Sequence, residues 1–455
     1  MKVLILDGSP AGDLTSALLL VALQAELEQR AAALTTLCLR EKHLSPCLGD
    51  FKCWVETPGL CHIHDDGRAL AQAVHDAEAV VLFGPSSFGG YCSGLKRGLD
   101  RLISLITPFF ETRAGEIHHL PRYARSPRLV GLAWTREPTA AREQVFAELV
   151  ESNAVNFSAP RHAAALVGSD PSAWREPLAR LCDEALAPGD LPPRVEQPEQ
   201  ERAGLFAAAR AAIAAGSPPA LPARATLLVG SARPSGASTS EALGRGLLSP
   251  LAARGAEVRV QHAVVFEHAQ RIEEAARELL STDLLVISTP LYVDSLPFLV
   301  TLALEAMAKA HVERPKPRLA AIVNCGFPEA AQCKSALAIA RAFAEENGLE
   351  WAGGLALGGG EALHGRAVAE LHGPFARVRA ALATAGEALA DSAPIPDPAI
   401  AELAQMLMPS WMYRMAGNVG NRWAARRNGL REGALLARPF DEVEHRQGPL
   451  GVEKP

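Results

Sequence analysis

The sequence lacks any apolar run that approaches the roughly 20 residues needed to cross a bilayer as a helix, so we expect no membrane span. The first ten residues, MKVLILDGSP, hold one Lys and a short apolar run, without the longer apolar core and small-residue cleavage site of a signal peptide. We interpret that run as a strand and the chain as cytoplasmic. The formal net charge is only −6 over 455 residues, which indicates neither a nucleic-acid partner nor a membrane partner.

Several familiar catalytic patterns are also missing. No Ser-His-Asp or paired-carboxylate arrangement stands out, so we assign no side chain as an acid or base catalyst, and the catalytic residues stay unassigned. The chain has eight Cys, which we expect to remain thiols in a reducing compartment.

Two halves of the chain repeat the same order of elements. Each half alternates short apolar runs rich in β-branched residues with amphipathic helical stretches, which is typical of βαβ units and a parallel sheet covered on both faces. The element-by-element match predicts an internal duplication. Ser9 and Pro85 are 76 residues apart, whereas Ser231 and Pro290 are 59 apart, so we expect a loop inserted in the first half between His43 and Cys61.

The composition divides the chain further. A length of 455 residues favours two domains. A stretch rich in Pro, Glu and Ala separates the halves and is interpreted as a linker. After about residue 395 the chain is apolar and basic, with four Met, and we expect helices that pack on a domain or on a partner; the end, 438–455, is expected to be loose. The predicted divisions are 1–186 (first domain), 187–222 (linker), 223–394 (second domain) and 395–455 (helical segment and tail).

Each half has a polar, hydroxyl-rich loop after its first strand. The loop sequences are GSPAGDLTS (8–16) and GSARPSGASTS (230–240), and neither is the G-x-G-x-x-G fingerprint or a Walker P-loop. A loop at the carboxyl end of a parallel strand that leads into a helix N-terminus suits a phosphate group. The second loop also supplies Arg233, whereas the first carries Asp13 and no basic residue, so we expect the second half to hold phosphate better. The alternative is that these Ser and Thr residues only cap helices.

These loops, combined with PSSFGGYCSGLKRGLDR (85–101) and the Cys-bearing stretch PCLGDFKCWVETPGLCHIHDD (46–66), resemble the flavodoxin-like NAD(P)H-dependent FMN reductases, including their iron–sulfur flavoprotein branch. In the second half, PLYVDSLP and NCGFPE look like the later flavin-contacting loops. The resemblance covers roughly 1–165 and 223–365. It implies two five-stranded parallel sheets of order 2-1-3-4-5, the cofactors FMN and NADPH or NADH, and a tandem duplication that mimics a homodimer as an intrachain pseudo-dimer, open to further homo-oligomerisation.

The resemblance also implies which residues bind FMN. The phosphate group would contact Ser9, Thr15, Ser16, Ser231, Arg233, Ser238, Thr239 and Ser240. The isoalloxazine ring would contact Pro85, Ser86, Ser87, Phe88, Gly89, Gly90, Pro290, Leu291, Tyr292 and Val293. A third loop would add Asn324 and Gly326, with a poorer counterpart at Thr135, Arg136 and Glu137. For Phe88 and Tyr292 the alternative is ordinary packing under a loop.

Other polar residues carry weaker hypotheses. An iron–sulfur cluster held by Cys47, Cys53 and Cys61 would lack its fourth thiolate, because Asp50 stands where the resemblance leads one to expect Cys. Zinc would need His62 or His64 as a further ligand, and the Cys spacings are not the tight C-x-x-C type. We therefore predict no metal site, and interpret the three Cys as redox-active or merely buried thiols.

Two further groups of polar residues receive a prediction. His118 and His119 are placed on a loop that faces the substrate or contacts the other domain. Lys96, Arg97, Asp100 and Arg101 are interpreted as a solvated helix face.

The leading hypothesis is an FMN-dependent NAD(P)H oxidoreductase that passes electrons to a small acceptor such as a quinone, a flavin, a nitro or azo compound, or a metal. A second is an electron carrier between protein partners, although the mild net charge disfavours it. A third is a binding or scaffold protein without FMN. Reduction of bound flavin by NAD(P)H separates the first two, and a colourless protein that takes up no FMN would favour the third.

Overall fold

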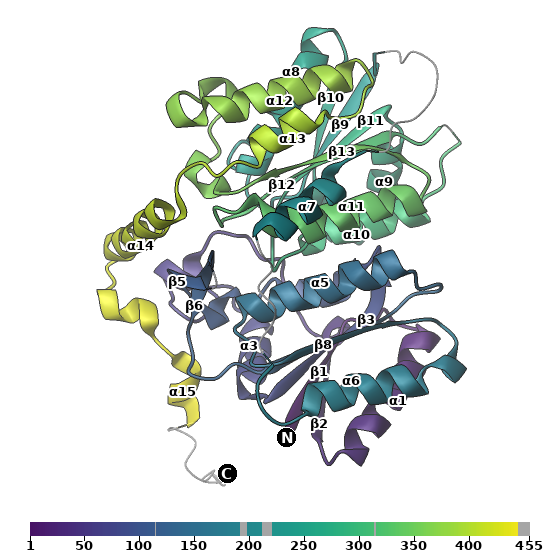
Figure 1. Cartoon of the computed structure of the whole chain (residues 1–455), viewed down its shortest axis with the longest axis vertical. Helices are drawn as coiled ribbons and strands as arrows, with labels where there is room; N and C mark the ends of the chain where they lie inside the picture. The colour runs from purple at the N-terminus through teal and green to yellow at the C-terminus, as the bar shows by residue number, and fades with distance from the viewer. Residues whose placement is uncertain (114, 192–197, 212–220, 314, 445–455) are drawn as a thin grey trace.

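A computed structural model describes residues 1–455 except 114, 192–197, 212–220, 314 and 445–455. Two α/β units follow one another along the chain and are stacked in space (Figure 1). The first, purple to blue, and the second, teal to green, each hold a parallel sheet between helices. The linker predicted over 187–222 lies partly outside the described residues, and its described part contains helix α7 (Pro198–Ala209).

The first unit contains a parallel sheet of order β2-β1-β3-β7-β8, with the short strand β4 antiparallel beside β3. Alternate residues of β1 face opposite sides: Val3 and Ile5 pack with α1 and α6, whereas Leu4 and Leu6 pack with α3, α4 and α5. The strands are β1 (Lys2–Asp7), β2 (Ala33–Cys38), β3 (Ala79–Ser87), β4 (Gly90–Tyr91), β7 (Arg128–Trp134) and β8 (His162–Val167). The helices are α1 (Leu14–Gln29), α2 (Lys52–Val55), α3 (Gly67–Asp76), α4 (Ser93–Leu99), α5 (Ala140–Asn156) and α6 (Arg175–Leu186).

The second unit repeats this arrangement with a sheet of order β10-β9-β11-β12-β13. Figure 1 shows α8 and α12 on one side of this sheet and α7, α10 and α11 on the side that faces the first unit. The strands are β9 (Arg224–Val229), β10 (Glu257–His262), β11 (Leu284–Pro290), β12 (Arg318–Asn324) and β13 (Glu350–Leu357). The helices are α8 (Thr239–Ala253), α9 (Ile272–Leu280), α10 (Phe298–Lys309), α11 (Lys334–Glu346) and α12 (Ala376–Ala390).

Both sheets confirm the predicted strand order 2-1-3-4-5 and the flavodoxin-like fold class. In this order the chain moves outward from the first strand to the second and then crosses back to the third. The loops after β1 and β3, and after β9 and β11, therefore lie at the switch point, where ligands of doubly wound sheets bind.

Three helices continue the chain after the second unit, as predicted. They are α13 (Asp397–Leu403), α14 (Ser410–Arg427) and α15 (Pro439–Glu444). The prediction of a loose end from 438 onward is wrong for α15, where Phe440 is buried against the rings of His75 and Tyr123. The rest of that prediction, 445–455, lies outside the described residues. None of the described helices is long and apolar enough to span a bilayer.

A hairpin of β5 (Ile106–Arg113) and β6 (Glu116–Pro121) stands beside the first sheet. His118 and His119 lie in β6 and are buried, so their prediction as loop residues is wrong. Ring centroids of His119 and Phe327 are 5.3 Å apart, which places this hairpin against the second unit. The hairpin therefore forms part of the contact between the two units, one of the two roles predicted for these histidines.

Candidate functional site

A cavity of about 190 Å³ opens where the predicted flavin loop of the first half meets the second unit. Ser86, Ser87, Phe88 and Gly89 of this loop line it, and Thr135 joins them from the end of β7. The second unit closes the opposite wall with residues of α10 and α11. These are Glu305, Ala308, Lys309 and Glu346. The structure thus brings together two of the three loops predicted for the first half.

The flavin loop of the first half makes a tight turn in which Phe88 (φ 57°) and Gly89 (φ 83°) both adopt left-handed conformations. Ser87 pairs with Gly90 across the turn. Two left-handed central residues are the mark of a type I′ turn, which suits Gly at the second position. The ring of Phe88 lies edge-on to Phe343, with centroids 5.1 Å apart, so this side chain packs on the second unit.

The corresponding loop of the second half makes the same turn. Val293 (φ 48°) and Asp294 (φ 56°) occupy its centre, and Tyr292 bridges to Ser295. A left-handed conformation is unusual for a β-branched residue and persists only where the surroundings enforce it. Here Asn153 of α5 donates to the Val293 carbonyl at 3.0 Å and to the Asp294 carboxylate at 2.8 Å. Helix α5 of the first unit therefore holds the second turn in place.

 The Ser9 hydroxyl is buried and has no hydrogen-bond partner among the described residues. Its backbone N–H donates to the Asp7 carboxylate at 2.9 Å. A buried hydroxyl without a partner loses free energy of the order of 1–3 kcal/mol, and a ligand oxygen in this loop would remove that loss.

The helix start beside Ser9 is already capped. The carboxylate of Asp13 accepts hydrogen bonds from the Ser16 N–H at 3.3 Å and from the Ser16 hydroxyl at 2.6 Å. The indole of Trp134, at the end of β7, donates to the same hydroxyl at 2.8 Å. Thr15 is half-buried on the first turn of α1. The loop therefore presents hydroxyl groups beside two carboxylates: Asp7, which pairs with Arg40 at 3.0 Å, and Asp13, whose negative charge disfavours a phosphate dianion.

In the second half the predicted phosphate residues converge but bond to one another and to their neighbours. Ser240 donates to the Asn324 side chain at 2.8 Å, and Thr239 donates to the Gly360 carbonyl at 3.1 Å. Ser238 caps α8 by accepting the Glu241 N–H at 3.1 Å. The hydroxyl of Ser231 accepts the Arg233 N–H at 3.3 Å.

Two acidic side chains neutralise this second loop. Glu361 pairs with Arg233 at 3.0 Å, and the same guanidinium donates to the Gly49 carbonyl at 2.7 Å. Glu241 accepts the Gly236 N–H at 2.6 Å, so a carboxylate of the chain itself takes an N–H group of the loop. Burial alone would raise the pKa of Glu241, but its bonds to Gly236 and Arg245 lower it, which favours the charged form.

The rest of the second site is covered by distant parts of the chain. Gly49 lies so close to the Tyr292 ring that a Cβ atom at Gly49 would sit 1.9 Å from the Tyr292 hydroxyl. The Gly326 carbonyl accepts a hydrogen bond from Tyr413 of α14. Pro290 and Leu291 continue from β11, and the Leu291 N–H donates to the Asn324 carbonyl at 2.8 Å. The second half therefore gathers its predicted residues into a closed, internally bonded cluster.

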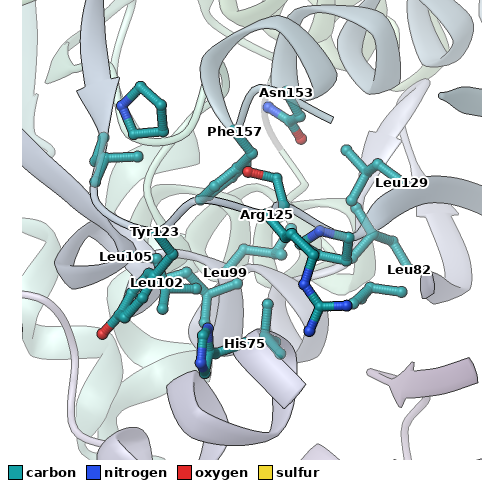
Figure 2. A pocket seen from close by; sticks show the side chains of 16 residues that line it. His75, Leu82, Leu99, Leu102, Leu105, Tyr123, Arg125, Leu129, Asn153 and Phe157 are labelled. Carbon is teal, nitrogen blue, oxygen red and sulfur yellow. The ribbon is translucent and has the colours of Figure 1, made fainter. Parts of the chain in front are cut away.

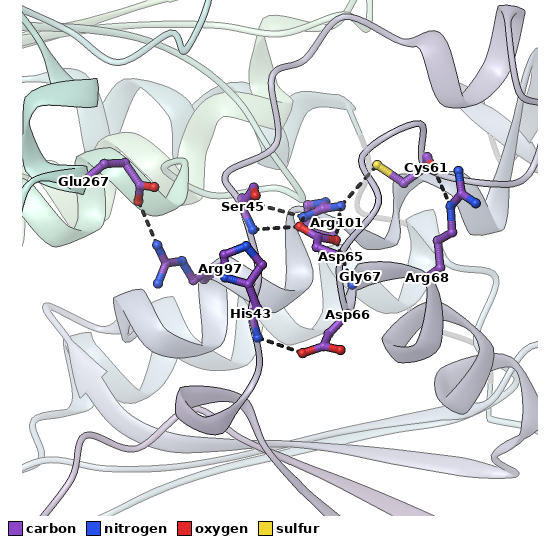
Figure 3. A network of polar contacts seen from close by, with 10 residues as sticks. All are labelled: His43, Ser45, Cys61, Asp65, Asp66, Gly67, Arg68, Arg97, Arg101 and Glu267. Carbon is purple, nitrogen blue, oxygen red and sulfur yellow. Dashed lines mark hydrogen bonds and ion pairs between the residues drawn. The ribbon is translucent and has the colours of Figure 1, made fainter.

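The Cys-bearing loop of the first half is fastened by a buried ion pair (Figure 3). Arg101 donates to both carboxylate oxygens of Asp65, at 2.7 and 2.8 Å, and also to the Cys61 sulfur at 3.2 Å. Burial alone would raise the pKa of Asp65, but the hydrogen bonds from Arg101 and from the N–H groups of Ser45 and Gly67 hold it well below its usual value.

The Cys53 thiol of this loop is buried, whereas those of Cys47 and Cys61 are half-buried. Burial raises the pKa of Cys47 to about 12 and that of Cys53 higher still, which disfavours thiolate chemistry. Among the described residues no three His, Cys, Asp or Glu side chains converge as a group that could hold a metal ion. Of the two predicted roles for these Cys, the buried thiol fits Cys53, whereas Cys61 is half-buried and accepts a hydrogen bond from Arg101.

The charged residues of α4 correct one prediction. Lys96, Asp100 and Arg101 are buried, with Lys96 0% exposed, so they do not form a solvated face. Lys96 pairs with Asp100 at 2.7 Å and donates to the Tyr292 carbonyl at 2.6 Å. Arg97 lies 4.5 Å from the centre of the Phe298 ring. The helix was misinterpreted because the second unit covers it. Lys96 and Asp100 pair with each other and bind backbone groups of the second unit, and Arg101 pairs with Asp65 of the Cys-bearing loop.

The two units exchange a pair of matching contacts at this interface. Glu305 of α10 accepts the N–H of Ser93, the first residue of α4, at 2.8 Å, and the Ser87 hydroxyl at 2.6 Å. Asp100, directly after α4, accepts the N–H of Phe298, the first residue of α10, at 2.8 Å. Each unit therefore supplies the carboxylate that caps the other unit's helix, and the Glu305 carboxylate also forms part of the cavity wall.

A second, apolar pocket lies elsewhere in the first unit (Figure 2). Leu82 and Leu129 come from the early part of β3 and β7, and Tyr123 and His75 lie at its side. It therefore lies toward the amino ends of the strands, away from the flavin loop. Sequence reasoning gave no signal for it, and its volume of about 40 Å³ is too small for a flavin or nicotinamide cofactor.

The comparisons with known proteins bear on the first half. A family model described as NADPH-dependent FMN reductase matches residues 1–115. An iron-sulfur flavoprotein of Methanocaldococcus jannaschii is 31% identical over 101 residues, which are 22% of this chain and 51% of the relative. The chain thus spans about half the length of that relative.

Among solved structures, the chain is similar to an azoreductase from Bacillus anthracis, with 11% sequence identity and a TM-score of 0.28. The match covers 37% of this chain and 99% of that chain. An NAD(P)H:quinone oxidoreductase from Methanothermobacter marburgensis is 14% identical with a TM-score of 0.26, covering 36% of this chain and 98% of that chain. In its first 115 residues the chain is similar to the NADPH-dependent FMN reductases, which confirms the family resemblance predicted from the loops of the first half.

Proposed function

We propose that the chain is an FMN-dependent oxidoreductase that accepts hydride from NADPH or NADH and passes electrons to a small acceptor. The observation that carries this proposal is the position of the cavity. Residues 1–115, which match the reductase family, contain both the phosphate loop and the flavin loop of the first half. The flavin loop lines a cavity at the switch point of its sheet, which is where the fold places a ligand.

The residues of the first half fit FMN at the ring end. The tight turn at Phe88 and Gly89 lines the cavity together with Ser86 and Ser87, whose hydroxyl groups donate to the Gly90 carbonyl and to Glu305 and keep oxygen lone pairs as acceptors. When bound, the flavin supplies the redox chemistry, while the protein supplies position and electrostatics. Two cations, Arg142 and Lys309, and two carboxylates, Glu305 and Glu346, also line the cavity, and Arg142 pairs with Glu346 at 2.7 Å.

At the phosphate end, Ser9 is the residue that fits best. Its buried hydroxyl lacks a partner among the described residues, whereas the hydroxyl of Ser16 is already bonded to Asp13 and Trp134. Thr15 lies on the same first turn of α1 and can add a hydroxyl. Asp13 opposes a phosphate dianion, so we expect this end to bind weakly compared with a loop that carries an Arg.

We infer that each chain holds one FMN, in the first half. In the second half the predicted phosphate residues are bonded within the chain, because Glu361 pairs with Arg233 and the hydroxyl groups of Ser240 and Thr239 donate to Asn324 and Gly360. The second unit then serves as the partner that completes the cavity, with Glu305 in the wall. This arrangement corresponds to an intrachain pseudo-dimer of two flavodoxin-like domains, 1–186 and 223–394, in which one site is kept.

The test compares two equivalent serines. The chain is reconstituted with FMN, and flavin bound per chain and its dissociation constant are measured for the wild type, Ser9→Ala and Ser231→Ala. We expect Ser9→Ala to weaken FMN binding about tenfold, because one charge-assisted hydrogen bond to phosphate is lost, without lowering the stability of the ligand-free chain. Ser231→Ala should leave FMN binding unchanged. The reverse pattern would place the flavin in the second half.

Anaerobic addition of NADPH or NADH then separates an oxidoreductase from an electron carrier. The oxidoreductase proposal requires that at least one of the two nicotinamide cofactors reduces the bound flavin rapidly, which is seen as bleaching of its absorbance. A flavin that is bound tightly yet is reduced only by dithionite would support the carrier. A chain that takes up no FMN under any of these conditions would support the scaffold protein instead.

A further inference from the structure

One helix of the C-terminal segment turns an apolar face to solvent. Trp411, Met415, Val419 and Trp423 follow one another at every fourth position of α14, so they lie along one side of the helix. They are 62%, 56%, 57% and 61% exposed. Isolated exposed apolar residues are ordinary, but a continuous stripe that includes two of the chain's six Trp marks an interaction surface.

The orientation of this stripe is fixed by the opposite face of α14. Asn418 forms two hydrogen bonds with the backbone of Phe110 in β5, at 2.7 and 3.2 Å, and Asn421 donates to the Pro108 carbonyl at 2.7 Å. Gly417 lies against the Phe110 ring, where a Cβ atom would be only 2.6 Å from a ring carbon. The helix therefore binds the hairpin through its polar face and holds its apolar face outward, along the flank seen in Figure 1.

The charge around the stripe has one sign. Between Glu402 and Glu432 the sequence holds five Arg and no Asp, Glu or Lys. These are Arg414, Arg422, Arg426, Arg427 and Arg431. The guanidinium of Arg427 lies 5.0 Å from the centre of the Trp423 ring, so charge and apolar surface are interleaved. The net charge of −6 for the whole chain conceals this local positive segment.

We propose that the outer face of α14 docks on an anionic lipid bilayer. Trp and aliphatic side chains enter the boundary between headgroups and acyl chains, while flanking Arg residues bind anionic headgroups. A nucleic acid could bind the Arg side chains through its phosphate groups but would leave Met415 and Val419 without an apolar environment. A bilayer satisfies both features of the face at once and needs no groove of matching shape. The net charge of the whole chain, which predicted no membrane partner, averages over this local positive surface and so does not reveal it.

The experiment measures binding of the full-length chain to vesicles by flotation. One vesicle population contains phosphatidylcholine alone, and the other contains phosphatidylcholine and phosphatidylglycerol in equal amounts. The variants are Trp411→Ser/Trp423→Ser, Arg427→Glu/Arg431→Glu and, as a control with the same change in charge, Arg259→Glu/Arg277→Glu on the exposed surface of the second unit. Circular dichroism confirms that each variant is folded.

We expect the wild type and the control to bind the anionic vesicles, and both α14 variants to bind them about tenfold more weakly or not at all, since basic side chains near an anionic surface and Trp side chains at the membrane interface both contribute to binding. Raised salt should weaken wild-type binding. Equal binding by wild type and variants, or no binding to anionic vesicles, overturns the proposal. A wild type that ignores vesicles but dimerises in the ultracentrifuge, with the dimer lost in Trp411→Ser/Trp423→Ser, would assign this face to a second copy of the chain. Flavin content does not enter these readouts, so they are independent of the proposed function.

Discussion

Asp100 and Glu305 make the same contact in opposite directions. Each carboxylate accepts, at 2.8 Å, the first N–H group of a helix in the other unit: Asp100 that of Phe298 and Glu305 that of Ser93. Such reciprocity is the property of an isologous interface, in which the same patch is used on both sides. The contacts therefore support an interface between the two units with the pseudo-two-fold symmetry of a dimer, formed within one chain.

Replacing the Asp100 carboxylate should lower the free energy of unfolding more than replacing the Glu305 carboxylate. Asp100→Asn leaves the fully buried ammonium of Lys96 without its counter-ion, which typically lowers the free energy of unfolding by about 3–5 kcal/mol. Glu305→Gln keeps the size of the side chain but loses charge-assisted hydrogen bonds, which should lower the free energy of unfolding by about 1–2 kcal/mol. Urea unfolding of both variants measures the difference. Equal, small losses would mean that Lys96 finds another partner and that the buried pair contributes little.

The Asp65–Arg101 pair should make stability depend on acid. The pKa of Asp65 is lowered in the folded chain, so its contribution is fully present above the unfolded pKa of about 3.9 and is lost as the pH falls through the folded value below it. We expect the difference in unfolding free energy between wild type and Asp65→Asn to be constant near neutral pH and to shrink below about pH 4. Chemical denaturation at a series of pH values checks this. A difference that does not change with pH contradicts the assignment.

Asp13 offers a change that should improve cofactor binding. Asp13→Asn keeps an N-cap side chain on α1 but removes a negative charge from the phosphate end, which is worth about 0.3–1 kcal/mol at a helix terminus. We expect the dissociation constant for FMN to fall about two- to fivefold. The matched control is Glu241→Gln, which removes the charge from the second loop and should leave FMN affinity unchanged. A gain with Glu241→Gln alone would assign the flavin to the second half.

The turn of the flavin loop can be tested at Gly89. Gly89→Ala places a Cβ atom in a left-handed position 3.3 Å from Val145, whereas Gly255→Ala introduces a left-handed Ala with open space around it. Both should cost about 1–2 kcal/mol of stability through the backbone. Only Gly89→Ala should also weaken FMN binding, because the turn lines the cavity. Parallel losses of affinity in both variants would point to global destabilisation rather than to the turn.

The sequence predicted the sheets because their signals are local. Apolar runs such as KVLIL and ATLLV alternate with stretches of helical periodicity, and Gly-Ser follows each first strand, so the strands and helices could be predicted from the residues. The order of the strands in each sheet was predicted from the family resemblance. The loops predicted to contact flavin lie at the switch point for the same reason. The buried charges and the Arg233 ion pair were missed because they depend on contacts between residues more than 100 positions apart.

The charged helix α4 illustrates that limit. Lys96 and Asp100 stand four residues apart, a spacing typical of exposed ion pairs on a helix, and nothing local shows that α10 covers them. His118 and His119 were placed in a loop because the polar residues around them interrupt the alternation that predicts strands. The pairing of Arg233 with Glu361 could not be predicted either, because Glu361 lies 128 positions further along the chain.

The most direct test of the account is the number and location of bound flavins. The reconstituted chain is freed of excess FMN, its flavin is counted per chain by absorbance, and NADPH or NADH is added anaerobically to the wild type and to Ser9→Ala. The account predicts one FMN per chain in the wild type, bleached by a nicotinamide cofactor, and a clear loss of flavin in Ser9→Ala. No bound flavin, or a full complement of flavin that survives Ser9→Ala, would contradict it.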